Sequence, residues 1–394
     1  MTTEINPNAG ARAPEQSNGR RRRALLAIAG VTAAALAAWG LWYLAVGRWH
    51  VDTDDAYVQG NVVGVTPQVG GTVVAIHAED GMRVEAGQVL VELDPSDATV
   101  ALEQAKANLA ATVRQVRGLY AAVDAGQAGM RARQVAVERA RADVARRTGL
   151  VASGAVSQEE LAHARNELAA AQAALATARE DLVRNRALVD ATSVASQPQV
   201  QAAAAQLRAA YLALQRARIV APVSGYVAQR RAQLGERVQP GAALMSVIPL
   251  EQVWVEANFK ETQLEKMRLG QPVVLTADVY GDAVEYHGRL ASLGLGTGSA
   301  FSLLPAQNAS GNWIKIVQRV PVRIELDGAQ LAAHPLRLGM SMSVDVSVRD
   351  QDGPVLPATA ASQPVLETQA YAKQLSDADA LIHEIVDQNL ARHG

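Results

Sequence analysis

The residues of this chain that could perform covalent or metal chemistry are not arranged for it. The sequence contains no cysteine, which excludes disulfides, thiolate catalysis and cysteine-ligated metals. Its histidines are scattered, and none has a second metal ligand at a spacing typical of zinc sites. Gly294-Leu295-Gly296-Thr297-Gly298 has the glycines of a phosphate-binding loop but lacks the lysine and hydroxyl residue that should follow. We therefore expect no catalytic residue, no cofactor and no metal.

The overall composition favours a binding or structural role. A net charge of −2 provides no positive field that would attract nucleic acid. Aromatic residues make up only 4% of the chain and alanine is abundant, as in long, closely packed helices. The elements that follow along the chain are therefore more informative than any single reactive side chain.

An apolar segment near the N-terminus predicts a membrane anchor. Residues 24–46 are uncharged and long enough to cross a bilayer as one helix. Arg20–Arg23 precede this segment, so we expect residues 1–23 to be a cytoplasmic tail and the rest of the chain to be exported. A cleaved signal peptide is the alternative, because Ala35-Leu36-Ala37 resembles a cleavage site. The apolar run continues well past it.

One glycine-rich motif occurs twice, in residues 67–95 and 221–249, and defines two domain halves, 67–95 and 220–249. The copies align without a gap and share glycines and alternating apolar residues, among them the pairs Gly71 and Gly225, Gly81 and Gly235, Val84 and Val238, Gly87 and Gly241, and Leu90 and Leu244. Each copy is typical of short strands with glycine turns and is too small to bury a core alone. We therefore expect two halves of one β-domain, packed on each other.

The segment between these halves, residues 96–219, has the repeat of a coiled coil. Apolar residues recur at every seventh position in two series: Leu102, Leu109, Val116, Val123, Met130, Val137 and Val144, then Leu161, Leu168, Leu175, Leu182 and Val189. The two series mirror each other about residues 152–153, as an antiparallel hairpin requires. A third series, Val200, Leu207 and Leu214, follows a stutter that carries Pro198.

The predicted tip of the hairpin, residues 147–157, contains the signals of a turn. Gly149 and Gly154 permit the change of direction, and Ser157 with Glu160 forms a capping box for the returning helix. Ser157 could serve only as a cap and Leu150 only as a plug of the hairpin end. Alternatively, both residues face a partner.

Residues 250–350 alternate apolar and polar side chains in short runs, which predicts a small antiparallel β-barrel approached by residues 47–66. A long loop in this region carries four large apolar residues, Phe301, Leu303, Leu304 and Trp313. They could contact a partner or plug the barrel core. Residues 351–394 are a linker that could end in a weakly amphipathic helix.

An anchor, a split lipoyl-like domain and a helical hairpin between its halves together resemble periplasmic adaptor proteins, also called membrane fusion proteins. Hairpin tips of that family share arginine, leucine and serine at the spacing of Arg146, Leu150 and Ser157. The resemblance implies that these residues bind the periplasmic end of a TolC-like outer-membrane channel.

The resemblance is more specific to EmrA-type adaptors of the HlyD/EmrA family. Three segments of this chain are similar to the corresponding segments of those adaptors, residues 53–58, 257–263 and 296–313. Such adaptors join an inner-membrane drug/proton antiporter of the major facilitator superfamily to the channel for multidrug efflux. The resemblance implies a non-catalytic, bacterial inner-membrane protein with its bulk in the periplasm, associating with further copies of itself. The apolar loop at 301–313 would then contact the antiporter.

The sequence thus predicts an elongated protein of mixed α and β structure. It would comprise a transmembrane helix, a split lipoyl-like domain with an inserted antiparallel coiled-coil hairpin, and a small antiparallel barrel. An adaptor of an ATP-driven type I protein secretion system is an alternative function. A lipoyl or biotinyl carrier is disfavoured, because neither half of the repeat contains a lysine.

Overall fold

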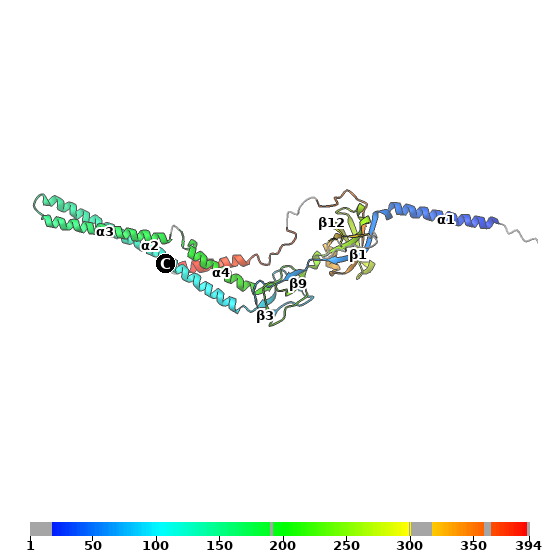
Figure 1. The fold of residues 1–394 in the computed structure, drawn as a ribbon, viewed down its shortest axis with the longest axis horizontal. Helices are drawn as coiled ribbons and strands as arrows, with labels where there is room; N and C mark the ends of the chain where they lie inside the picture. The colour runs from blue at the N-terminus through cyan, green and yellow to red at the C-terminus, as the bar shows by residue number, and fades with distance from the viewer. Residues whose placement is uncertain (1–17, 190–191, 299, 301–316, 358–363, 392–394) are drawn as a thin grey trace, which may run out of the picture. The chain divides into compact units, whose positions relative to one another are not determined.

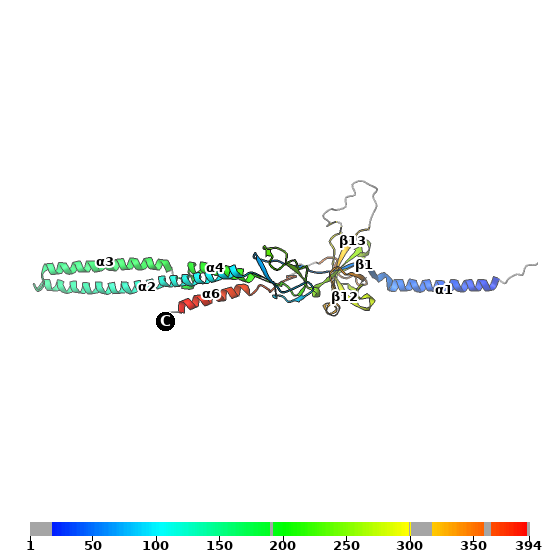
Figure 2. The same ribbon diagram turned by 90° about the horizontal axis from the view of Figure 1, so that it is seen from below.

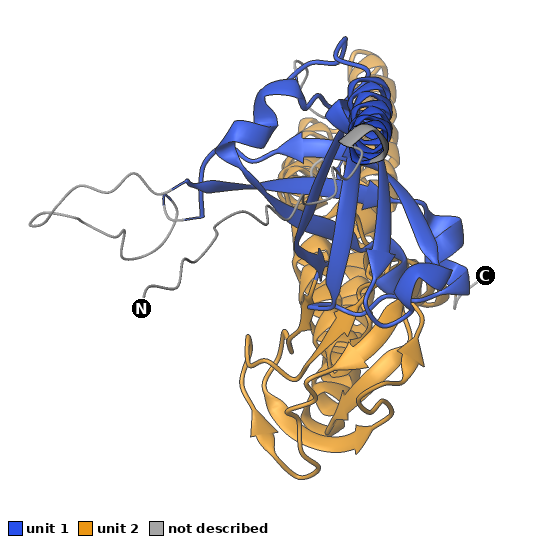
Figure 3. Ribbon diagram, turned by 90° about the vertical axis from the view of Figure 1, so that its right-hand side faces the viewer, with its two compact units in different colours: residues 1–61, 250–365 blue, residues 62–249, 366–394 orange. Residues whose placement is uncertain are grey.

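The computed structural model describes residues 18–189, 192–298, 300, 317–357 and 364–391 (Figure 1). The chain divides into two compact units, which Figure 3 shows in different colours. Unit 1 comprises residues 1–61 and 250–365, and unit 2 comprises residues 62–249 and 366–394. The chain therefore passes from unit 1 to unit 2, back again, and once more into unit 2.

The N-terminal apolar helix predicted from the sequence is present as α1 (Asn18–Ala45). Its leucines, tryptophans and other large apolar side chains are exposed along its whole length. Within the described residues it is the one helix that is long and apolar enough to cross a membrane. A short 3₁₀ turn, η1 (Gly47–Trp49), leads from it into the first strand.

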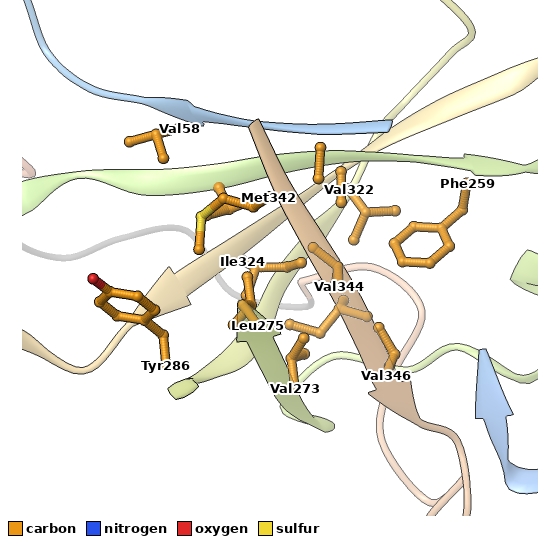
Figure 4. Packing of buried hydrophobic residues seen from close by; sticks show 14 of the residues in the cluster. Val58, Phe259, Val273, Leu275, Tyr286, Val322, Ile324, Met342, Val344 and Val346 are labelled. Carbon is orange, nitrogen blue, oxygen red and sulfur yellow. The ribbon is translucent and has the colours of Figure 1, made fainter. Parts of the chain in front are cut away.

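The described strands of unit 1 close into an antiparallel barrel, as predicted, in the order β1-β10-β13-β12-β11-β14. Their bounds are β1 His50–Gln59, β10 Trp254–Lys260, β11 Pro272–Ala277, β12 Glu285–Leu293, β13 Arg319–Leu326 and β14 Ser341–Ser347. Strands β10, β13 and β14 alternate buried and more accessible residues, so that one face fills the interior. Figure 4 shows this core, which contains Val58, Phe259, Leu275, Tyr286, Ile324 and Val344.

Short helical segments join the barrel strands. These are η3 Leu250–Gln252, η4 Glu261–Lys266, η5 Gly281–Ala283 and α5 Gly328–Ala333. Asp327 caps α5 by accepting a hydrogen bond from the Ala329 amide at 3.1 Å. The barrel is therefore a continuous core with compact connections wherever the structure describes them.

The two copies of the glycine motif form two small sheets in unit 2, with strand orders β2-β9-β7-β4 and β6-β5-β3-β8. The strands are β2 Val63–Val65, β3 Gly71–Ile76, β4 Arg83–Val84, β5 Val89–Leu93, β6 Arg218–Val220, β7 Gly225–Ala228, β8 Arg237–Val238 and β9 Met245–Ile248. Strands of the two copies exchange partners in equivalent ways, because Gly71 pairs with Val238 and Val84 pairs with Gly225. Buried residues of both copies form a single cluster, so neither half has a core of its own.

The helical hairpin between these halves is built from α2 (Ser96–Val151), α3 (Gln158–Val189) and α4 (Pro198–Arg216). Most of the heptad residues are buried at its seam, including Leu109, Val137, Leu182 and Leu207. One expectation is wrong in detail. The irregularity before Pro198 is a break between two helices and not a stutter within one helix, because α3 ends at Val189 and α4 begins at Pro198, a residue suited to the first position of a new helix.

A last helix, α6 (Gln374–Ala391), lies beside α2 and α4 in both Figure 1 and Figure 2. The sequence predicted no more than a weak helix here and no packing partner for it. Ile382 and Val386 of α6 belong to the same buried cluster as Leu109 and Leu207. The hairpin therefore has three helices at its base and two toward its tip.

Candidate functional site: the tip of the hairpin

The tip is the turn between α2 and α3, and it includes the three residues singled out by the sequence. Arg146 and Leu150 stand four residues apart in the last turns of α2, on the same side of that helix. Ser157 directly precedes α3. The structure thus places all three residues at the connection between α2 and α3. No hydrogen bond joins any one of them to another in the described residues.

Arg146 is held in place on the helix by an acidic neighbour. Its Nη2 donates to Asp143 Oδ1 at 2.5 Å, and Arg147 Nε donates to Asp143 Oδ2 at 2.8 Å. The hydrogen bond from Arg146 lowers the pKa of the Asp143 carboxyl below its usual value, so the pair is ionised at neutral pH. The Arg146 side chain nevertheless remains 68% exposed. Its guanidinium can still bind an acceptor on a partner.

Leu150 contributes an apolar surface at the end of the hairpin. The residue is 42% exposed, although its carbonyl accepts a hydrogen bond from Ser153 Oγ at 2.8 Å. An apolar side chain with this exposure at a helix end does not seal the seam by itself. It leaves area available for a contact.

Ser157 performs the capping role that the sequence predicted. Its Oγ accepts from the Glu160 amide at 3.2 Å, while its own amide donates to Glu160 Oε2 at 2.9 Å. The amide of Ser157, and then its hydroxyl, lower the pKa of Glu160. Ser157 is therefore a structural residue of the tip, whatever else it contacts.

The turn itself differs from its prediction at one glycine. Gly154 has φ of +72°, in the left-handed region that other residues avoid. Gly149 was expected to help turn the chain, but it lies inside α2 and lacks a positive φ. The helix continues through Gly149 to Val151, and Thr148 Oγ1 donates to the Val144 carbonyl at 2.7 Å within it.

The other predicted contact residues lie elsewhere. Phe301, Leu303, Leu304 and Trp313 fall outside the described residues. Within the described part of the chain, no group of three or more histidine, aspartate or glutamate side chains could hold a metal ion.

A polar cleft of about 730 Å³ on the barrel was not anticipated. It is lined by Asp52, Thr53, Asp54, Asp55, Tyr57, Lys260, Gln263 and Arg319. The register of β1 shifts between Thr53 and Ala56, and Arg319 Nη1 binds Asp55 Oδ2 at 2.6 Å. Asp54 and Asp55 lie in residues 47–66, the predicted approach to the barrel, and are part of strand β1 itself.

Comparison with known proteins places this architecture in a family. The family described as "EMRA, alpha-helical hairpin domain" matches residues 96–217, and the "AAEA-like beta-barrel domain" matches residues 252–347. The multidrug export protein EmrA of Escherichia coli is 44% identical over 388 residues, covering 98% of this chain and all of that protein. The fatty acid resistance protein FarA of Neisseria gonorrhoeae is 46% identical over 339 residues, covering 86% of this chain and 85% of that protein.

Among solved structures, the periplasmic adaptor protein EmrA aligns with 76% of this chain and 98% of its own, at 16% identity and a TM-score of 0.38. Family membership accordingly rests on the sequence relatives, which match nearly from end to end. The chain belongs to the EmrA family of membrane fusion proteins.

Proposed function

We propose that this protein is a periplasmic adaptor that links an inner-membrane antiporter of the major facilitator superfamily to a TolC-like outer-membrane channel for multidrug efflux. It has no catalytic role in this proposal. Its similarity to a multidrug export protein over almost the whole of both chains supports the assignment. Helix α1 would anchor it in the inner membrane with the N-terminus in the cytoplasm, and the bulk of the chain would lie in the periplasm.

The observation that carries the docking role is the exposed pair Arg146 and Leu150 at the tip. A guanidinium and an aliphatic side chain side by side on a helix end suit a partner with a carbonyl or carboxylate next to an apolar groove. Several copies of the adaptor would present this pair as a ring to the channel, so that modest contacts add up.

The test combines Arg146→Ala, Leu150→Ala and Ser157→Asn, since asparagine is as good a helix cap as serine and leaves the fold of the tip intact. A matched control exists on α3. Arg184 is exposed and paired with Asp181 at 2.6 Å, as Arg146 is with Asp143, and Val183 is an exposed apolar neighbour. The control therefore carries Val183→Ala and Arg184→Ala.

We expect the tip variant to lose crosslinking to the channel and drug resistance in cells, and the control to keep both at equal expression. If the tip variant still crosslinks to the channel as well as the control does, the docking assignment is wrong. Copurification from the same cells identifies the inner-membrane partner. An ATP-binding transporter in place of an antiporter would favour a protein secretion adaptor.

The apolar residues Phe301, Leu303, Leu304 and Trp313 are proposed as the antiporter contact. Alanine at all four positions should reduce copurification with the antiporter while leaving channel crosslinking unchanged. Undiminished copurification would count against this loop.

A further inference from the structure

The C-terminal helix α6 docks on the base of the hairpin through one apolar face. Ala378, Ile382 and Val386 recur at four-residue spacing and are buried against α2 and α4. On the hairpin side this cluster includes Val113, which is fully buried together with the seam residues around it. The contact is thus continuous with the core of the coiled coil.

Polar contacts fix the position of α6 along the hairpin. Near its start, Asp379 Oδ1 accepts from Arg208 Nε of α4 at 2.8 Å. Near its end, the side chain of Asn389 accepts from Arg114 Nη1 at 2.8 Å and its carbonyl accepts from Arg117 Nη1 at 2.9 Å. Two arginines of α2 thereby meet the negative end of the α6 dipole. A helix held by apolar contacts alone could slide by a turn, but these bonds specify one register.

The segment leading into α6 is attached as well. Thr368 Oγ1 donates to the Pro222 carbonyl at 2.6 Å, at the start of the second half of the lipoyl-like domain. Tyr371 is 38% exposed and lines a small pocket together with Arg216 and Arg218. Docking therefore extends over both the lipoyl-like domain and the hairpin base of unit 2.

The docked helix α6 packs beside α4, which is separated from α3 by a break in the helix. Between α3 and α4 the chain leaves the helical path, and Gln197 Nε2 binds the Val189 carbonyl at 2.8 Å and Thr192 Oγ1 at 2.6 Å across the break. Tyr120 of α2 donates its hydroxyl to the Thr192 carbonyl at the same level. In the described residues α3 ends at Val189 and α4 begins anew at Pro198, so α4 depends on lateral contacts to stay in place.

We propose that α6 is an intramolecular splint, which holds the detached helix α4 against α2 and covers the apolar face of the hairpin base. The splint is the chain's own C-terminal segment and not that of a neighbouring copy. With α6 released, α4 would open more often, and the uncovered apolar face would pair with a second hairpin base.

The first experiment releases α6 in the full-length protein. Ile382→Asp with Val386→Asp places two charges on the buried face, and His383→Asp with Gln388→Asp places two aspartates on the exposed face as the matched control. Hydrogen exchange of residues 198–216 should be about tenfold faster or more in the first variant and unchanged in the control. Residues 161–182 of α3 report on the fold of the distal hairpin and should exchange as in the parent protein.

Unchanged exchange of residues 198–216 in the first variant would overturn the splint. A general loss of protection in α3 as well would also contradict it, because the proposal confines the effect to the base. Size-exclusion chromatography of the first variant should show additional self-association, and its absence would refute the covering role.

The second experiment asks whether docking occurs within one chain. The native sequence has no cysteine, so Arg208→Cys with Asp379→Cys provides a single addressable pair. A short bismaleimide should join the two positions within a monomer. A covalent dimer as the main product would show that α6 docks on a neighbouring copy.

A charge exchange tests the register of α6. Arg208→Asp and Asp379→Arg should each make hydrogen exchange of residues 198–216 faster, and the two together should restore slow exchange. Failure of the combination to restore slow exchange would contradict the assigned register.

Discussion

The repeated glycines Gly71 and Gly225 should respond very differently to the same substitution, alanine. They occupy equivalent positions in the two halves of the lipoyl-like domain, and neither has a positive φ, so alanine is conformationally allowed at both. The two positions differ in the space available to a Cβ atom. A Cβ on Gly225 would lie 2.5 Å from the carbonyl oxygen of Ile248 and 2.9 Å from the nitrogen of Pro249, whereas a Cβ on Gly71 would lie 3.2 Å from the Cβ of Leu93.

The change in the free energy of unfolding depends on which atoms must move to make room for the added Cβ. At Gly225 the obstruction is backbone of a neighbouring strand, which cannot rotate aside, and such overpacking costs about 1–3 kcal/mol. At Gly71 a slight shift of Leu93 suffices, and the smaller entropy of the unfolded chain offsets it by about 0.4–1 kcal/mol. We expect Gly225→Ala to destabilise the domain by about 2 kcal/mol, equivalent to roughly 30-fold faster exchange of its protected amides, and Gly71→Ala to be nearly neutral.

Hydrogen exchange is the suitable assay for this comparison. The tryptophans of the chain, Trp39, Trp42, Trp49, Trp254 and Trp313, all fall in unit 1, so their fluorescence does not follow unfolding of the lipoyl-like domain. The amides of residues 225–228 and 245–248 should be measured in both variants. Equal acceleration by the two substitutions, or none by Gly225→Ala, would refute the steric argument.

Two further predictions concern the hairpin and the barrel. Leu109→Ala should destabilise the hairpin by about 2–5 kcal/mol because Leu109 is 0% exposed. Val100 is 70% exposed, so the control Val100→Ala should change stability by less than about 0.5 kcal/mol. Thermal unfolding followed by circular dichroism compares the two variants. Burial raises the pKa of Tyr286 to about 12, and its hydroxyl donates to the His334 carbonyl at 2.9 Å. The neutral phenol therefore stabilises the barrel below pH 10, and this contribution should be lost as the pH rises from 10 to about 12. Tyr286→Phe should lower the free energy of unfolding by about 1 kcal/mol at neutral pH. It should also remove the loss of stability between pH 10 and about 12, which denaturant titration of the parent protein and the variant across that range would measure. An unchanged pH dependence in the variant would contradict the assignment.

The sequence predicted the parts of this protein whose signals are periodic. Heptad positions such as Leu109 and Leu182 indicated a coiled coil because burial along one helix face repeats with the helix itself. The glycine motif indicated two interdependent halves, and its strands do share one buried cluster. The capping box of Ser157 and Glu160 was predictable because it depends on residues only three positions apart.

Features that depend on distant contacts were missed or only partly predicted. The break before Pro198 was read as a stutter, since the heptad series resumes after it and sequence spacing does not distinguish an unwound helix from two helices. The buried face of α6 was missed because Ala378 and Val386 are weak signals until α2 and α4 are placed beside them.

The sequence by itself determined the anchor helix, the hairpin, the split domain and the residues that stand at the tip. These depend on local hydrophobic patterns and turn residues, which are written into neighbouring positions. Tertiary structure alone decided that Gly225 faces backbone while Gly71 faces a side chain, and that α6 completes the hairpin base. Both outcomes depend on which distant segment approaches a given position and how closely, and a single sequence does not contain that distance.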